Sequence, residues 1–107
     1  MSRYLCLYHG PATPMADFTP EQADESTRAW GEWIGRSGPS LVDIGTPFGQ
    51  RTAVKENGAT VAPSEQNGYS IVEADSLEAA LALLKGHPYL AGGKSTLRIE
   101  VFELVPM

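Results

Sequence analysis

A histidine and an aspartate stand at positions that suit general acid–base chemistry. His9 closes the first apolar run of the chain, and Asp43 lies toward the end of the second. A histidine changes its charge near neutral pH, and a nearby carboxylate can orient its ring for proton transfer. The alternative is a histidine at a loop edge and a solvated aspartate, and the sequence is compatible with both interpretations.

Four more side chains are candidates for binding a ligand. Tyr69 and Tyr89 could line a pocket with their hydroxyls, although tyrosines at strand edges most often serve in packing. Trp30 is spaced from Trp33 at a helical interval, which favours packing in the core. His87 follows a predicted helix, where a cation would meet the negative end of the helix dipole, so a structural role is an alternative there as well.

Metal and thiol chemistry are not indicated by the remaining residues. The two histidines lack the spacing of metal ligands. Cys6, the only cysteine, lies three residues before His9, and residues three apart on a strand point to opposite faces. We therefore interpret Cys6 as a small buried side chain, and we expect neither a metal nor another cofactor.

Four strands and a hairpin are predicted to position these side chains. Apolar runs at residues 3–9, 40–45, 68–74 and 96–104 are typical of strands. Between the second and third of these runs, residues 51–61 are typical of a hairpin, because their Asn-Gly pair supplies a left-handed turn.

Two helices are predicted between the strands. The first begins at Pro20, after the capping residue Thr19, and runs to about Arg36. The second follows Ser76, ends near Gly86 and carries apolar residues at positions i, i+3, i+4 and i+7. These apolar residues are Leu77, Ala80, Leu81 and Leu84.

The order of the elements is that of a single α+β domain spanning residues 1–107. The order β-α-β-hairpin-β-α-β is the split βαβ pattern, which predicts a ferredoxin-like βαββαβ fold with an antiparallel sheet of order 4-1-3-2. The candidates expected near one end of this sheet are His9, Asp43, Tyr69, His87 and Tyr89. Both helices should cover one face, so the other, apolar face predicts a homodimer packed sheet to sheet.

Composition limits the partners and the location of the protein. The chain has 107 residues and a formal net charge of −5, without the basic stripe that nucleic-acid-binding domains normally carry. No stretch approaches the roughly 20 apolar residues of a membrane helix, and the N-terminal apolar run is too short and mixed for a signal peptide. We therefore expect a cytoplasmic protein that binds neither nucleic acid nor membrane.

Several runs along nearly the whole chain resemble one known family. They are the opening RYLCLYHG, AWGEWIGRSG at the end of the first helix, LVDIGTPF, and NGYSIVEADSLEAALALLKGHPYL. They are similar to the YCII-related proteins, in particular the DGPF-domain branch, although residues 61–64 read VAPS where that branch has Asp-Gly-Pro-Phe. The resemblance implies a ferredoxin-like dimer, also called a dimeric α/β barrel, with relatives that include muconolactone-type isomerases and dehalogenases.

These observations lead to one main hypothesis of function and two alternatives. The main hypothesis is a small-molecule enzyme without a cofactor, whose pocket lies between sheet and helices and which performs proton transfer or lactone isomerisation. His9 would act as acid or base with Asp43 as its partner, and the four other candidates would bind the ligand. The alternatives are a non-catalytic ligand-binding or protein-interaction module, and a cofactor-free monooxygenase of the same fold.

Overall fold

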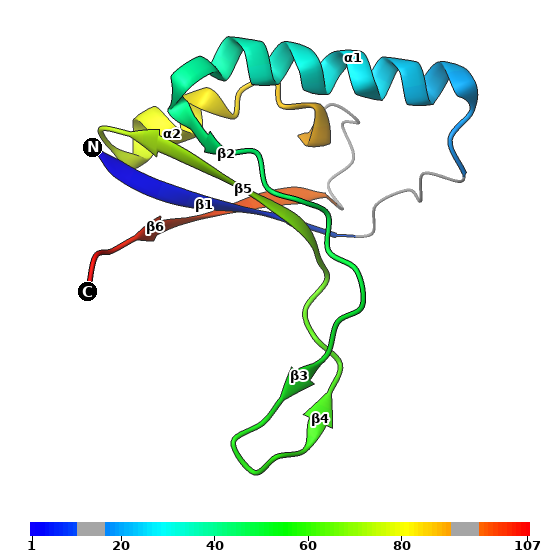
Figure 1. The fold of residues 1–107 in the computed structure, drawn as a ribbon, viewed down its shortest axis with the longest axis vertical. Helices are drawn as coiled ribbons and strands as arrows, with labels where there is room; N and C mark the ends of the chain where they lie inside the picture. The colour runs from blue at the N-terminus through cyan, green and yellow to red at the C-terminus, as the bar shows by residue number, and fades with distance from the viewer. Residues whose placement is uncertain (11–16, 91–96) are drawn as a thin grey trace.

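The chain forms a four-stranded sheet with two helices on one face and a hairpin that extends away on the other side (Figure 1). The computed structural model describes residues 1–10, 17–90 and 97–107. The strands are β1 (Ser2–His9), β2 (Leu41–Asp43), β3 (Ala53–Val54), β4 (Thr60–Val61), β5 (Gln66–Ala74) and β6 (Arg98–Leu104). The helices are α1 (Pro20–Ser37) and α2 (Leu77–Leu83), with 3₁₀ turns at Gly38–Ser40 and Pro88–Leu90. Within the described residues, neither helix is long and apolar enough to cross a bilayer.

The strands of the main sheet lie in the order β2-β5-β1-β6, and each neighbouring pair is antiparallel. β1 and β2 therefore run in the same direction, with β5 between them. When the hairpin strands are left out, this order reads 2-3-1-4, which is 4-1-3-2 counted from the opposite edge. The architecture is a small α+β fold that is compatible with the ferredoxin-like class.

The alternation of side chains along β1 decides which groups the helices cover. Tyr4, Cys6 and Tyr8 are buried on the helix side, where Tyr4 and Cys6 belong to the core. Successive strand residues point to opposite faces, so Leu7 and His9 lie on the face without helices. Cys6 and His9 are therefore on opposite faces, as their spacing predicts.

Helix α1 begins where its capping sequence predicts. The Thr19 hydroxyl accepts a hydrogen bond from the backbone N–H of Gln22 at 3.1 Å, and the Gln22 side chain accepts one from the backbone N–H of Thr19 at 2.9 Å. This capping box satisfies amides that have no partner inside the helix. The inner face of α1 carries Trp33, which is 1% exposed and donates its indole hydrogen to the Leu83 carbonyl at 2.9 Å. That bond joins α1 to α2.

The apolar stripe predicted for α2 is partly wrong. Ala80 and Leu84 are 0% and 5% exposed, but Leu77 and Leu81 are 50% and 48% exposed. Successive helical residues turn by about 100°, and the inner face of α2 also includes Leu83, which packs against the core. The buried face is therefore rotated away from Leu81. The helix also ends at Leu83, three residues before its predicted stop.

The second strand and the hairpin are less regular than their sequence patterns predict. β2 spans only Leu41–Asp43 of the predicted 40–45, and β3 pairs with β4 through two residue pairs. At the tip of the hairpin Gly58 has a φ of 87°, but Asn57 does not have a positive φ, so the left-handed conformation predicted for the Asn-Gly pair is present at Gly58 alone. The predicted start of the last strand, residue 96, lies outside the described residues.

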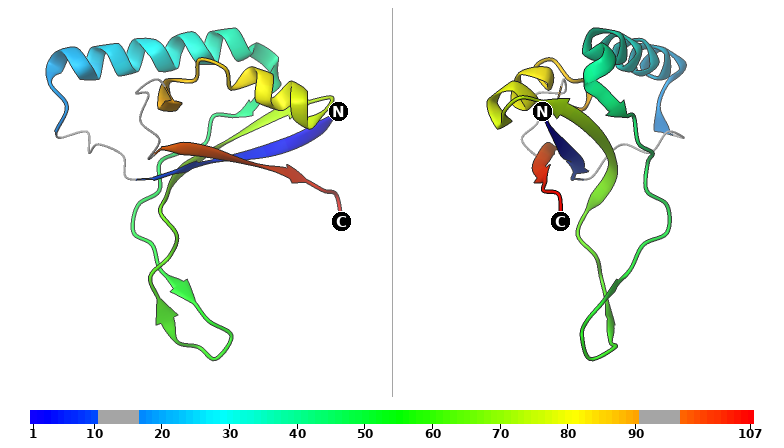
Figure 2. Two further views of the ribbon diagram at one scale, coloured as in Figure 1. Left: turned by 180° about the vertical axis from the view of Figure 1, so that it is seen from behind. Right: turned by 60° about the vertical axis from the view of Figure 1, so that its left-hand side comes forward.

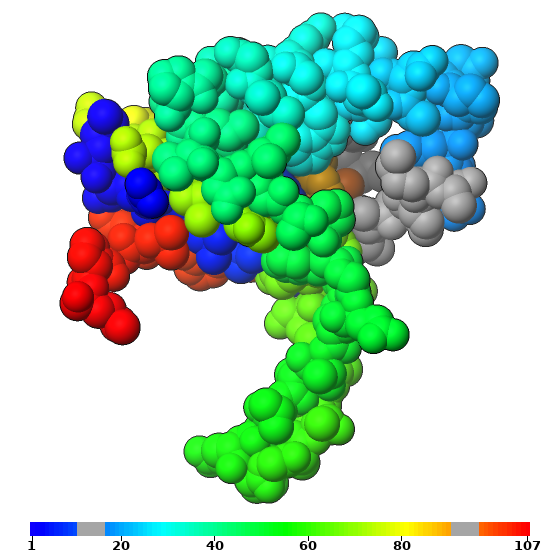
Figure 3. Space-filling model, in the orientation of Figure 1, coloured from blue at the N-terminus to red at the C-terminus, as the bar shows by residue number. Residues whose placement is uncertain are grey.

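The sheet face opposite the helices is apolar, and no described element covers it (Figure 2). Leu5 and Ile71 face each other across the strand pair on this side, and the neighbouring Phe102 of β6 is 50% exposed. The hairpin projects beyond this face with Val54 71% exposed, and the space-filling view shows a hollow between the hairpin and the C-terminal segment (Figure 3). An apolar surface of this kind is typical of a protein interface.

Candidate ligand pocket

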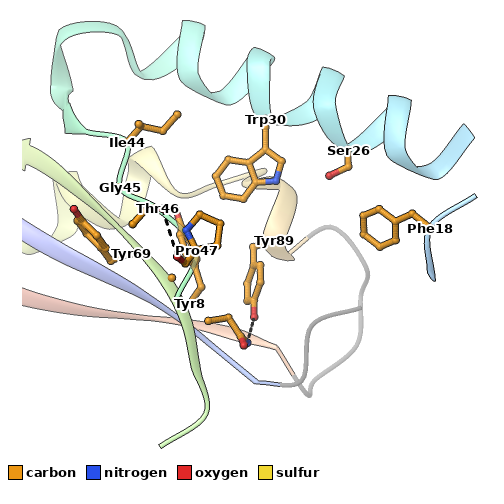
Figure 4. Close-up of a pocket in the computed structure, with 12 residues that line it drawn as sticks. Tyr8, Phe18, Ser26, Trp30, Ile44, Gly45, Thr46, Pro47, Tyr69 and Tyr89 are labelled. Carbon is orange, nitrogen blue, oxygen red and sulfur yellow. Dashed lines mark hydrogen bonds between the residues drawn. The ribbon is translucent and has the colours of Figure 1, made fainter. Parts of the chain in front are cut away.

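A cavity of about 370 Å³ lies between α1 and the sheet, near the end of β1 (Figure 4). Its walls come from α1, from residues 44–47 after β2, from residues 67–69 of β5 and from the turn after α2. Small-molecule sites are clefts of roughly 300–1,000 Å³, so the cavity has room for a ligand of one or two rings. The aromatic residues that line it are Tyr8, Phe18, Trp30, Tyr69 and Tyr89. Of these, Tyr69 pairs with Leu7 of β1, so its side chain points to the helix-free side of the sheet, where its hydroxyl reaches Asp43.

Three of these aromatic side chains hold one another in place. The ring centroids of Tyr8 and Trp30 are 5.6 Å apart in an edge-to-face arrangement, with 86° between the ring planes. The rings of Tyr8 and Tyr89 are 5.1 Å apart and tilted by 45°. None of the described residues that line the cavity carries a charge. An ion bound here would lose its hydration without gaining a charged partner, so the cavity suits an uncharged ring.

A chain of buried hydrogen bonds supports the cavity wall from behind. His87 is fully buried, and its Nδ1 accepts from the backbone N–H of Tyr89 at 3.0 Å, which leaves the ring hydrogen on Nε2. That Nε2 lies 3.2 Å from the Tyr8 hydroxyl and donates to it. The Tyr8 hydroxyl donates to Ser70 Oγ at 2.7 Å, and Ser70 donates to the Ile44 carbonyl at 2.7 Å. The chain of hydrogen bonds thus runs in one direction, from the turn after α2 to the segment that forms the opposite wall.

Burial keeps both titratable members of this chain uncharged. Loss of hydration, followed by the positive charge of Arg36, lowers the pKa of His87 from 6.5 to about 4. Loss of hydration raises the pKa of Tyr8 to about 12, although its hydrogen bond to Ser70 acts in the opposite direction. A neutral histidine and a protonated tyrosine are the forms that the hydrogen bonds require. The interpretation of His87 as a cation at the end of the helix dipole is therefore wrong.

The segment after β2 approaches β5 more closely than a side chain would allow. Gly45 has a φ of 78°, and a Cβ atom there would lie 1.7 Å from the carbonyl oxygen of Tyr69. Asp43 stabilises this bend, because Oδ1 accepts from the backbone N–H of Gly45 at 2.8 Å and Oδ2 accepts from the Tyr69 hydroxyl at 3.2 Å. The close approach lets residues 44–47 form one side of the cavity.

The cavity brings together three of the six residues that the sequence singles out. Trp30, Tyr69 and Tyr89 line it, and His87 lies behind its wall. The candidate acid–base pair does not line it. Asp43 belongs to the edge strand β2, which β5 separates from the strand that carries His9.

His9 has its own polar surroundings on the sheet face without helices. Its Nδ1 lies 3.2 Å from the side-chain nitrogen of Gln66, which also donates to Glu100 at 3.2 Å. Among the described residues, no group of three or more His, Cys, Asp or Glu side chains could hold a metal ion. Because His9 lies on the helix-free face of the sheet, it faces the surface that the homodimer prediction would cover, and not the cavity.

Among the residues that sequence reasoning missed, Tyr8, Asn67 and Ser70 carry the hydrogen bonds at the cavity and behind its wall. Tyr8 shares the alternation of Tyr4 and Cys6, and a buried tyrosine hydroxyl needs a partner, so the strand pattern held a signal for it. Ser70 and Asn67 carried no such signal. Asn67 donates through its side-chain nitrogen to the Tyr89 hydroxyl at 3.0 Å and to the backbone carbonyl of Gly10.

Comparison with known proteins supports the fold class. No family model matches this sequence, and no curated protein matches it. Among solved structures, the chain is similar to 5-chloro-2-hydroxyhydroquinone dehydrochlorinase (TftG) from Burkholderia phenoliruptrix AC1100, in complex with 2,5-dihydroxybenzoquinone. The TM-score is 0.51 at 14% sequence identity, and the match covers 92% of this chain and 90% of that chain. At this identity the likeness shows a shared fold.

Proposed function

We propose that this chain binds an uncharged small molecule with a ring system in the cavity beneath α1. The observation that carries the proposal is a cavity with aromatic walls and no charged lining among the described residues, held by the buried chain from His87 to Ile44. Ligand sites combine apolar walls with a few fixed polar groups, and this cavity has both. The similar fold of TftG, whose structure holds a quinone, agrees with a ring-shaped ligand.

A cofactor-independent enzyme of the YCII-related type is the second candidate. Its support is the sequence resemblance, together with the likeness to a dehydrochlorinase. His9 and Asp43 would transfer the proton, as acid or base and partner. Asp43 pairs with Ile71, and His9 alternates with Tyr8, so both lie toward the helix-free side of the sheet. The geometry supports binding more directly than catalysis, because neither residue lines the cavity.

Filling the cavity from α1 should abolish binding of an apolar ring. We choose 2-ethylnaphthalene as the probe and Ser26→Trp as the change, because Ser26 lines the cavity from α1 and a tryptophan there would occupy part of its volume. The dissociation constant, measured by amide chemical shifts in an NMR titration, should rise by about tenfold or more. Thr27→Trp is the matched control, since Thr27 is exposed and does not line the cavity. Equal affinity in all three proteins would place the probe elsewhere and remove the proposal.

We also propose that the chain is a homodimer packed through the helix-free sheet face. Stable interfaces bury about 1,600 Å² in total, and this apolar face with the projecting hairpin offers a surface of suitable chemistry. Sedimentation at micromolar concentration should show a dimer, and Phe102→Asp should give a monomer because Phe102 lies on this face. Leu81→Asp, on the exposed side of α2, should remain dimeric. A monomeric parent protein would contradict the proposal.

A further inference from the structure

We infer that Tyr89 donates its hydroxyl hydrogen to the ligand, so that the cavity selects rings bearing a neutral acceptor such as a carbonyl oxygen. This inference rests on the function proposed above and assigns one group in the cavity a chemical task. It follows from the direction of the hydrogen bonds around Tyr89, from the way its ring is held, and from the absence of charge among the described lining residues.

The direction of the bond between Asn67 and Tyr89 is set by a backbone carbonyl. The side-chain nitrogen of Asn67 donates to the carbonyl oxygen of Gly10, which can only accept. The opposite orientation of the amide would bring two oxygens together, so the same nitrogen also faces the Tyr89 hydroxyl, 3.0 Å away. An amide nitrogen only donates, and the Tyr89 oxygen must therefore be the acceptor in this bond.

The Tyr89 hydroxyl consequently keeps its own hydrogen for another partner. Within residues 1–10, 17–90 and 97–107, the structure shows no acceptor for it. A phenolic hydrogen lies near the plane of its ring, so with Asn67 on one side of the oxygen the hydrogen points to the other side. In Figure 4 the Tyr89 ring lies below Trp30, and the dashed line at its oxygen marks the 3.0 Å bond from the side-chain nitrogen of Asn67.

The position of Tyr89 is held at both ends before any ligand arrives. Its backbone N–H donates to the buried Nδ1 of His87 at 3.0 Å, and its ring packs on Tyr8 with centroids 5.1 Å apart. A donor that is already oriented loses little freedom on binding, so its hydrogen bond contributes more to affinity than one from a mobile side chain. Asn67 and His87 are positioning residues in this scheme, since each acts through Tyr89.

Because none of the described lining residues is charged, the cavity should bind a carbonyl compound more tightly than a carboxylate. A neutral acceptor exchanges one bond to water for one bond to Tyr89, which is nearly balanced. A carboxylate would lose most of the water molecules bound to it and would gain only the one hydrogen bond from Tyr89, which is unfavourable. The cavity should therefore prefer a ketone over an acid of the same size.

Three probes of one shape test the assignment: 2-acetylnaphthalene, 2-ethylnaphthalene and 2-naphthoate. With the parent protein, we expect the acid to bind at least about tenfold more weakly than the ketone. Tyr89→Phe should weaken the ketone by about two- to tenfold and change the affinity for the ethyl compound by less than about twofold. Tyr4→Phe is the matched control, because Tyr4 is a buried tyrosine of the core that does not line the cavity, so the change should leave the affinities for all three probes within about twofold of the parent protein.

Asn67→Asp tests the direction of the hydrogen bond itself. A carboxylate at position 67 only accepts, so it would turn away from the Gly10 carbonyl and take the Tyr89 hydrogen, and the variant should lose the ketone preference as Tyr89→Phe does. Circular dichroism confirms that each variant is folded, and the affinity for 2-ethylnaphthalene confirms that its cavity is intact. If the ethyl compound binds in the cavity but Tyr89→Phe leaves the ketone affinity unchanged, this inference is wrong and the proposed function stands. If no probe binds in the cavity, the proposed function itself fails.

Discussion

Replacing Trp33 by alanine should lower the free energy of unfolding by about 3–5 kcal/mol, the usual cost of removing a large buried aromatic side chain. Trp33 is 1% exposed, and the centroid of its ring lies 4.3 Å from the centroid of the His87 ring. The change also removes the bond from the indole to the Leu83 carbonyl, which joins the two helices. Urea unfolding, followed by circular dichroism, measures the effect.

The loss of stability on Trp33→Ala should depend on how much buried volume is removed, so a series of substitutions of different size tests it. Trp33→Phe keeps most of the ring and loses the indole donor, and it should cost less than half as much as Trp33→Ala. Leu81→Ala is a control on an exposed position, with 48% of that residue exposed, and should change stability by less than about 1 kcal/mol. If Trp33→Ala were as mild as Leu81→Ala, the inner face of α1 would be misplaced.

Acid should destabilise the protein through His87 well before most carboxylates are protonated. The pKa of His87 is about 4 in the folded protein, against an ordinary value of 6.5 for a histidine, so between these pH values the unfolded chain binds a proton that the folded chain does not. Stability therefore falls as the pH drops from 6.5 toward 4, and the loss amounts to about 3 kcal/mol at the lower end. Urea midpoints at pH 7, 6, 5 and 4 would record it.

The two histidines of the chain provide the control for this experiment. His87→Gln removes the buried group, and its stability should depend much less on pH between 6.5 and 5, whatever its absolute value. His9→Gln changes a residue that is only partly buried and leaves His87 in place, so the acid-dependent loss should persist. An unchanged pH slope in His87→Gln would show that another group is responsible.

The sequence predicted those parts of the fold that depend on local interactions. The cap at Thr19 and the turn at Gly58 involve residues within three positions of each other, and both are present. The rotation of α2 was missed because the buried face of a short helix depends on what lies beneath it, and Trp33 is fifty positions from its partner Leu83. Spacing within α2 alone made Leu81 as good a core residue as Leu84.

The candidate site was harder to predict, because its bonds join distant parts of the chain. Tyr8 contacts Ser70 and His87 across 62 and 79 positions, and no sequence pattern shows such a pair. Both the odd-numbered and the even-numbered residues of β1 include apolar side chains, so its sequence does not show which face of the strand meets the helices. The sequence therefore placed His9 at the end of its strand but could not show that it lies on the face away from the cavity.

The close contact between the backbone of Gly45 and the Tyr69 carbonyl restricts position 45 to glycine. Any other amino acid would place a Cβ atom 1.7 Å from that oxygen and would also have to adopt a φ of 78°. Ser26 and Trp30 line the same cavity from α1, where no residue has a positive φ and the backbone does not require glycine. The cavity thus has one wall whose backbone shape requires glycine and one whose backbone shape does not.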